Sequence, residues 1–180
     1  MHKKVLVIST SLRKNSNSEA LADAFIAGAR EAGNDVEKIS LAGKKMEFCR
    51  GCLACQKIGH CVIKDDAIAI AEKMHDAEVI AFASPIYYYE MSGQMKTLLD
   101  RANSLYGSDY AFSDIYFLST AAEDAEGVDE RAIHGLEGWI ECFDRAHLAG
   151  TVFAGGVNEP GEVAGHPSLE KARKMGTDIK

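Results

Sequence analysis

The sequence lacks the two features that would point to a membrane or a nucleic acid as its partner. No apolar run approaches the roughly 20 residues that a membrane-spanning helix needs. Lysine and arginine total 20 against 27 aspartates and glutamates, and the formal net charge is −7. Because affinity for nucleic acid depends on gathered positive charge, we expect no nucleic-acid binding, and we expect no membrane association either.

We also expect neither a secretion signal nor a boundary between domains. The basic opening MHKK leads into VLVIS, an apolar segment too short for the core of a signal peptide, so a cytoplasmic protein is expected. No linker, repeat or low-complexity tract divides the 180 residues, and 47% of them are hydrophobic. The sequence therefore predicts a single domain over residues 1–180.

Short apolar runs of strand length alternate with amphipathic stretches of helical spacing along the chain. The expected strands are Lys4–Ser9, Asp35–Leu41, Glu78–Ser84, Asp114–Thr120 and Gly150–Ala154. The expected helices begin near Ser16, Asp65, Ser92, Asp129 and Pro167, and the fourth is expected to reach Ala146. Such alternation predicts an α/β fold with three layers, in which helices cover both faces of a doubly wound, five-stranded parallel sheet.

The loop after the first strand contains no glycine, which argues against the G-x-G-x-x-G pattern of dinucleotide-binding loops. Its residues, STSLRKNSNS, instead offer hydroxyl groups, two asparagines and Arg13 just before a helix N-terminus. Hydroxyl and backbone N–H donors, together with the helix dipole, suit a single terminal phosphate. A polar turn with an N-cap at Ser16 is the simpler alternative.

Aromatic and small side chains follow the third and fourth strands at the same expected edge of the sheet. Tyr87, Tyr88 and Tyr89 come directly after a buried strand and could wall a planar ligand, although packing over a helix or at a subunit interface would also account for them. After the fourth strand, the small residues 119–122 leave room for a ring. A phosphate at one end and a flat ring at the other describe FMN.

Two motifs resemble signatures of the NADPH-dependent FMN reductase family, whose fold is flavodoxin-like. S-x-R-x-x-S-N-S, which begins at Ser11, resembles its phosphate loop, and PIYYYEMSGQMKTLLDR, which ends at Arg101, resembles the segment that frames its flavin. The resemblance extends to about residue 122 and implies the strand order 2-1-3-4-5. It implies FMN held at the phosphate by Ser9, Ser11, Arg13, Ser16, Asn17 and Ser18, and at the ring by Pro85, Ile86, Tyr87, Tyr88, Thr120 and Ala121.

The same resemblance implies an oxidoreductase in which NAD(P)H reduces FMN, and FMN then passes electrons to a quinone, a flavin or another small acceptor. The cofactor carries the chemistry in such enzymes, so no side chain is expected to act as a catalytic acid or base. Members of this fold usually dimerise across the flavin face, and a homodimer or homotetramer is expected.

Four of the five cysteines stand in CRGCLACQKIGHC, within an insertion at about residues 43–64. A disulfide is the least expected use in a reducing cytosol, and structural zinc sites typically combine two separated C-x2-C knuckles. The spacing C-x2-C-x2-C-x5-C suits a [4Fe–4S] cluster better, although no proline follows the fourth cysteine as it does in ferredoxins. Thiols without metal, free or redox-active, are the other alternative. Cys142 is expected to be an ordinary buried thiol.

This segment also resembles that of the iron–sulfur flavoproteins, relatives of the FMN reductases with a compact cysteine motif before the same Asp-Asp helix. The resemblance implies Cys49, Cys52, Cys55 and Cys61 as ligands of a [4Fe–4S] cluster. It offers an alternative function, an electron carrier that uses FMN and a cluster to connect a ferredoxin-like partner with an acceptor. Asp65 and Asp66 are expected to stabilise the N-terminus of the helix that they open.

Overall fold

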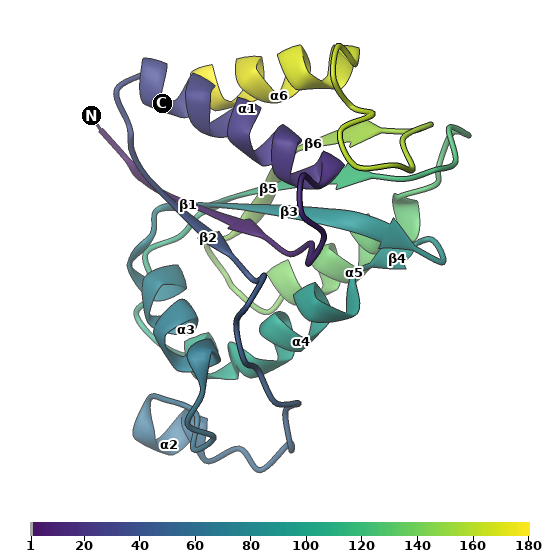
Figure 1. Cartoon of the computed structure of the whole chain (residues 1–180). Coiled ribbons are helices and arrows are strands. Elements are labelled where there is room, and N and C mark those ends of the chain that lie inside the picture. Colours follow the sequence, from purple (N-terminus) through teal and green to yellow (C-terminus); the bar gives the residue numbers. More distant parts are fainter. Residues whose placement is uncertain (1) are drawn as a thin grey trace.

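The computed structural model describes residues 2–180, in which a twisted sheet forms the centre of the molecule (Figure 1). Five strands run parallel in the order β2-β1-β3-β5-β6, and β4 pairs antiparallel with the end of β3. The strands are β1 (Lys4–Ser9), β2 (Asp35–Ser40), β3 (Val79–Tyr87), β4 (Glu90–Met91), β5 (Asp114–Thr120) and β6 (His147–Ala154). Since β5 and β6 are the fourth and fifth parallel strands along the chain, the predicted order 2-1-3-4-5 is confirmed.

Helices cover both faces of the sheet, so the predicted three layers are confirmed as well. Figure 1 shows α1 and α6 on one face and α3, α4 and α5 on the other. The helices are α1 (Asn17–Glu31), α2 (Cys55–Ile58), α3 (Asp66–Asp76), α4 (Gly93–Arg101), α5 (Glu130–Ile140) and α6 (Pro167–Thr177), with a 3-10 turn η1 (Asn103–Leu105). Among residues 2–180, none of these helices has the length and apolar character that a membrane crossing requires.

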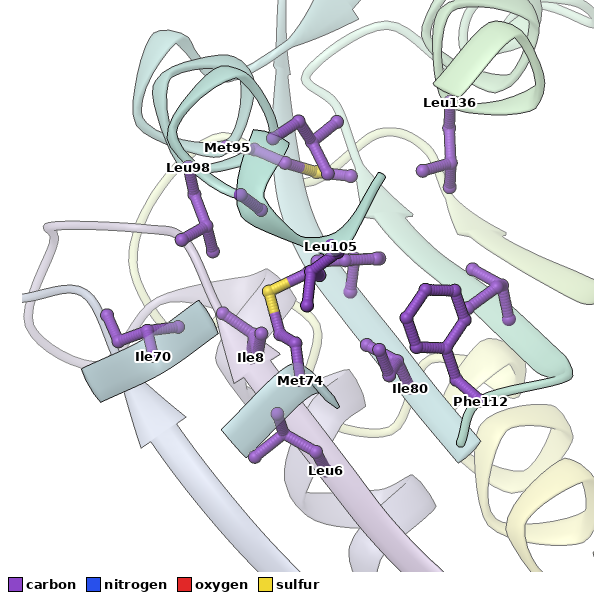
Figure 2. Packing of buried hydrophobic residues seen from close by; sticks show 14 of the residues in the cluster. Leu6, Ile8, Ile70, Met74, Ile80, Met95, Leu98, Leu105, Phe112 and Leu136 are labelled. Atoms are coloured by element: carbon purple, nitrogen blue, oxygen red, sulfur yellow. The ribbon is translucent and has the colours of Figure 1, made fainter. Parts of the chain in front are cut away.

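The two faces of the sheet bury two separate hydrophobic clusters. Along β1, Leu6 and Ile8 belong to the cluster under α3, α4 and α5, while Val5 and Val7 belong to the cluster under α1 and α6. Figure 2 shows the first cluster, in which Ile8 and the side chains of α3 and α4 point toward one another. Burial on both faces explains why the central strands read as continuous apolar runs rather than as alternating ones.

Helices α1 and α6 approach each other closely because a glycine lies on each of them. A Cβ atom on Gly28 would come within 1.9 Å of the Arg173 carbonyl oxygen, and one on Gly176 within 2.1 Å of the Phe25 carbonyl oxygen. Any side chain at either position would therefore push the helices apart. This contact holds the last helix of the chain on the first.

Three predicted boundaries are wrong. The fifth predicted strand begins at His147 and not at Gly150, because it pairs with β5 from Asp114 onward. The third strand does not stop at Ser84, because Pro85 still pairs with Thr120 and the chain then forms a hairpin with β4. The fourth predicted helix does not reach Ala146. After Ile140 the backbone forms turns in place of an α-helix. The amide of Phe143, for example, donates to the carbonyl of Ile140, three residues earlier, at 2.9 Å.

The β3–β4 hairpin turns through two residues in the left-handed region of backbone conformation. Tyr88 and Tyr89 have φ angles of 52° and 67°, and Tyr87 pairs with Glu90 on either side of them. Positive φ at both central residues is the geometry of a type I′ turn, which favours Asn-Gly. Two tyrosines here place backbone strain at the carboxyl edge of the sheet, where strain often accompanies a functional site.

This strain can be measured by comparing two substitutions of the same tyrosine. Both Tyr88→Gly and Tyr88→Ala remove the ring, but only glycine adopts a positive φ without a steric penalty. We therefore expect the glycine variant to have a free energy of unfolding about 1 kcal/mol above that of the alanine variant, measured by urea denaturation of the flavin-free chain. The same pair at Lys96, inside α4, should give the reverse order, because alanine is the better helix former. Equal stabilities at position 88 would contradict the strained hairpin.

Candidate functional site

A cavity of about 290 Å³ opens at the carboxyl edge of the sheet, where β1, β3 and β5 end side by side. Loops after four strands contribute to its wall. Ten of the twelve residues predicted for FMN line it: Ser11, Arg13, Ser16, Asn17, Pro85, Ile86, Tyr87, Tyr88, Thr120 and Ala121. The tertiary structure thus brings together side chains that are up to 110 positions apart in the sequence, at the place where open α/β sheets bind ligands.

The other two predicted residues, Ser9 and Ser18, do not line the cavity. Both are fully buried beneath it. The Ser18 hydroxyl lies 3.0 Å from the hydroxyl of Ser16, and within residues 2–180 the Ser9 hydroxyl has no hydrogen-bond partner. The two side chains are therefore buried inside the first loop and are not part of its surface.

One end of the cavity is formed by the N-terminus of α1. Ser16 is the N-cap, and its Oγ accepts a hydrogen bond of 3.4 Å from the amide of Glu19. The Glu19 carboxylate pairs with the Lys38 ammonium at 2.9 Å and does not reach back to the cap, so a reciprocal capping box is only half formed. With Arg13 beside them, the helix N-terminus and the serine hydroxyls make this end suited to an anion.

Part of the cavity wall comes from the loop after β6, which the sequence analysis missed. Val157, Asn158 and Pro160 of this loop line the cavity in addition to the predicted residues. The turn sequence NEPG at residues 158–161, shortly after the fifth predicted strand, was the available signal, because this strand ends at the same edge of the sheet.

Two predicted phosphate ligands hold this β6 loop in place. The Arg13 Nη1 donates to the Asn158 carbonyl at 2.8 Å. The Asn17 Nδ2 donates to the Glu159 carbonyl at 2.9 Å, and its Oδ1 accepts from the amides of Gly161 and Val163 at 3.0 and 3.2 Å. The Asn17 amide group is therefore engaged with the loop. The Arg13 Nη2 also lies 3.7 Å from the Glu159 carboxylate, and 47% of the Arg13 side-chain surface stays exposed.

The other end of the cavity is aromatic and open. Pro85 and Ile86 are partly buried, Tyr87 is half exposed, and Tyr88 projects from the tip of the hairpin with 98% of its surface exposed. Hydrogen bonds behind this wall connect three segments: the Ser92 amide donates to Ser84 Oγ at 2.9 Å, and the hydroxyls of Ser92 and Thr10 lie 2.9 Å apart. Ser92 also caps α4, as predicted.

A second cavity, of about 450 Å³, is lined by the cysteines. Cys49, Cys52, Cys55 and Cys61 all border it, together with Cys142. The prediction that Cys142 is buried is wrong: α5 ends at Ile140, so Cys142 lies in the following turn with its thiol exposed. In Figure 1 the cysteine segment around α2 projects from the molecule well away from the β3–β4 hairpin.

The cysteines of residues 2–180 form no disulfide in the structure. Within the same residues, no three cysteine, histidine or acidic side chains converge closely enough to bind a single metal ion. The segment is anchored at its C-terminal end by Asp65, which caps α3 by accepting a hydrogen bond of 3.1 Å from the Ala67 amide, as expected from the sequence. Asp65 also binds the buried guanidinium of Arg101.

The relatives of the chain agree with this architecture. An iron–sulfur flavoprotein of Archaeoglobus fulgidus is 30% identical over 176 residues, which cover 98% of this chain and 78% of that protein. One of Methanosarcina thermophila is 28% identical over 175 residues, which cover 97% and 88%. Among solved structures, the NAD(P)H:quinone oxidoreductase from Methanothermobacter marburgensis superposes with a TM-score of 0.75 over the full length of both chains, at 18% identity. Residues 3–155 match the NADPH-dependent FMN reductase family, so the chain belongs to that family.

Proposed function

We propose that this protein uses FMN to pass electrons from NAD(P)H to a quinone, a flavin or another small acceptor. The observation that carries the proposal is the single cavity at the sheet edge, which joins an anion-binding end at α1 to an open aromatic end at the hairpin. Membership of the NADPH-dependent FMN reductase family supports both the cofactor and the reaction class. When bound, FMN accepts hydride from a nicotinamide and can release electrons to an acceptor.

The residues at the anion-binding end fit a terminal phosphate. The hydroxyls of Ser11 and Ser16 and the Arg13 guanidinium would bind its oxygens, and the first backbone amides of α1 would donate to them. Arg13 would exchange its long contact with the Glu159 carboxylate, at 3.7 Å, for the phosphate. Asn17 would contribute its backbone amide, because its side chain already holds the β6 loop. Ser9 and Ser18 would support this loop from below.

The residues at the open end would orient the ring system. Pro85, Ile86 and Tyr87 line the cavity from the end of β3, and Thr120 with Ala121 lines it from the end of the neighbouring β5. Within residues 2–180, the titratable side chains that line the cavity are Arg13 and two tyrosines; no carboxylate, histidine or cysteine is among them. This supports the prediction that the protein binds and orients the flavin and leaves proton and hydride chemistry to the cofactor and co-substrate.

The reductase activity can be tested directly by stopped-flow mixing of the FMN-loaded protein with NADPH or NADH under argon. We expect loss of the oxidised flavin absorbance within seconds at millimolar nicotinamide, followed by recovery when a quinone is added. Enzymes of ordinary efficiency turn over at roughly 1–1,000 per second, so reduction should fall in this range. Bleaching no faster than that caused by a chemical reductant would show that the chain has no nicotinamide site.

The phosphate end is tested by Arg13. Replacing it by alanine removes a charge-assisted hydrogen bond, and we expect FMN affinity to fall about tenfold, measured by fluorescence quenching of added FMN. Arg13→Lys should keep part of the affinity because it keeps the charge. Arg30→Ala, at the far end of α1, is the matched control and should leave the affinity within a factor of two. Unchanged binding in Arg13→Ala would place the phosphate elsewhere.

A second function is favoured by the cysteine cavity. All four thiols of the C-x2-C-x2-C-x5-C motif border one cavity, and thiolates are the ligands that iron–sulfur clusters require. The relatives from Archaeoglobus fulgidus and Methanosarcina thermophila are named iron–sulfur flavoproteins. We infer that Cys49, Cys52, Cys55 and Cys61 would hold a [4Fe–4S] cluster, which would supply one-electron transfer to a protein partner such as a ferredoxin.

Anaerobic reconstitution separates this cluster from the alternatives of zinc and metal-free thiols. We expect about four irons and four acid-labile sulfides per chain, with a broad visible absorbance beneath the flavin bands. Cys52→Ser should lose most of the iron, because it removes one of the four thiolate ligands. Cys142→Ser is the matched control, since Cys142 lines the same cavity but lies outside the motif, and it should retain the iron. Equal iron content in the two variants, or far less than four irons in the wild type, would overturn the assignment.

The oligomeric state and the cellular location are also proposals. The hairpin tip and the first loop expose Tyr88 and Leu12 beside the flavin cavity, with 98% and 53% of their surfaces accessible. Exposed apolar side chains around a functional cavity support the predicted homodimer or homotetramer. The cytoplasmic location stays a prediction from the sequence.

A further inference from the structure

Arg101 ends the segment that resembles the flavin motif, yet it does not contact the flavin cavity. It is the last residue of α4, and its side chain has no exposed surface. A guanidinium is costly to bury unless its hydrogen bonds and its charge are satisfied. What surrounds Arg101 therefore indicates what it does.

The guanidinium holds both ends of the cysteine segment. Nη1 donates to the Glu47 carbonyl at 2.6 Å, and Nη2 donates to the Ile63 carbonyl at 3.1 Å. Glu47 lies two residues before Cys49, and Ile63 lies two residues after Cys61. One side chain thus closes the loop that carries all four motif cysteines.

A carboxylate completes this closure. Asp65 accepts from Nη1 and Nη2 at 2.6 and 2.8 Å, and it also accepts the Glu47 amide at 2.8 Å. Burial acts to raise the pKa of Asp65, but the hydrogen bonds from Arg101, Glu47 and Ala67 outweigh it and hold the pKa below its usual value. The pair therefore stays ionised at neutral pH, and the bidentate geometry fixes the plane of the guanidinium.

One donor of the guanidinium remains. Within residues 2–180, the buried Nε of Arg101 has no hydrogen-bond partner. Arg101 and Cys61 line the same cavity. The four hydrogen bonds of Nη1 and Nη2 all go to the two ends of the loop or to Asp65, so the guanidinium acts on the ends of the cysteine segment.

The helix that carries Arg101 begins at the flavin cavity. Its N-cap, Ser92, is bonded to Ser84 and Thr10 behind the aromatic wall. At a rise of about 1.5 Å per residue, the nine residues of α4 span about 13 Å. One rigid element therefore connects the support of the flavin cavity to the closure of the cysteine loop.

We propose that Arg101 is a positioning residue that sets the geometry of the cysteine segment by clamping its two ends. The clamp is a property of the chain itself and does not depend on a bound cluster.

The clamp is tested in the reduced, full-length chain without added iron, by the rate at which iodoacetamide alkylates each cysteine, resolved by mass spectrometry. Arg101→Lys keeps the positive charge but cannot bind two carbonyls and a carboxylate at once. We expect it to raise the alkylation rate of Cys61 at least about fivefold relative to Cys142, with FMN affinity within a factor of two. Asp65→Asn should loosen the same loop. Arg173→Lys is the control, because it alters an exposed ion pair between Arg173 on α6 and Glu31 on α1. It should change neither the alkylation rate of Cys61 nor the FMN affinity.

Unchanged alkylation of Cys61 in Arg101→Lys would overturn the clamp. Should that variant lack a cooperative unfolding transition and therefore not fold, unchanged alkylation in Asp65→Asn would overturn it in the same way. A wild-type chain that takes up no cluster would overturn the cluster alone, while the alkylation rates would still decide the clamp.

Discussion

The structure depends on the in-register parallel pairing of β3 with β1 on one side and β5 on the other. Because parallel strands carry their carboxyl ends to the same edge, this pairing delivers the serine loop, the tyrosine hairpin and the small residues after β5 to one cavity. Ala81 and Phe82 of β3 are fully buried, each under a different face of the sheet, so the register cannot slip without exposing apolar surface. The hydrogen bonds of Ser92 to Ser84 and Thr10 then fix the loops to each other.

The two cavities use different physical means to hold their shape. At the sheet edge, neutral hydroxyls, backbone amides and a helix N-terminus leave donors available to an anion. The β6 loop forms one side of this cavity, and the Asn17 side chain holds the loop there by hydrogen bonds. The cysteine segment has almost no regular structure of its own, and a buried ion pair closes it. A single bidentate pair can do this because a guanidinium has five donors in a fixed plane. Since both charges lose their hydration on burial, such a pair adds little net stability, but removal of one partner is costly because it leaves the other charge buried and unpaired.

Most of the fold and much of the flavin cavity could be predicted, because local signals coincide there with the final structure. The boundaries of β1 and β5 agree with the apolar runs, and the caps at Ser16, Asp65 and Ser92 are where the sequence indicates them. The β6 loop was missed because it contains no chemical motif, only turn residues whose relevance depends on which strand ends beside which. The role of Arg101 was missed because it is the last residue of the segment that resembles the flavin motif, although the nine residues of α4 carry it to the other cavity.

By itself, the sequence determined the alternation of strands and helices, the phosphate-suited loop before α1 and the spacing of the four cysteines, since each depends on residues close together along the chain. Only the tertiary structure decided that ten of the predicted residues share one cavity, that Ser9 and Ser18 lie beneath it, and that Cys142 joins the motif cysteines at a second one. It also decided that one arginine closes the cysteine loop. The reason is the same in each case: burial and hydrogen bonding between distant segments depend on how the elements pack, and no local pattern encodes that packing.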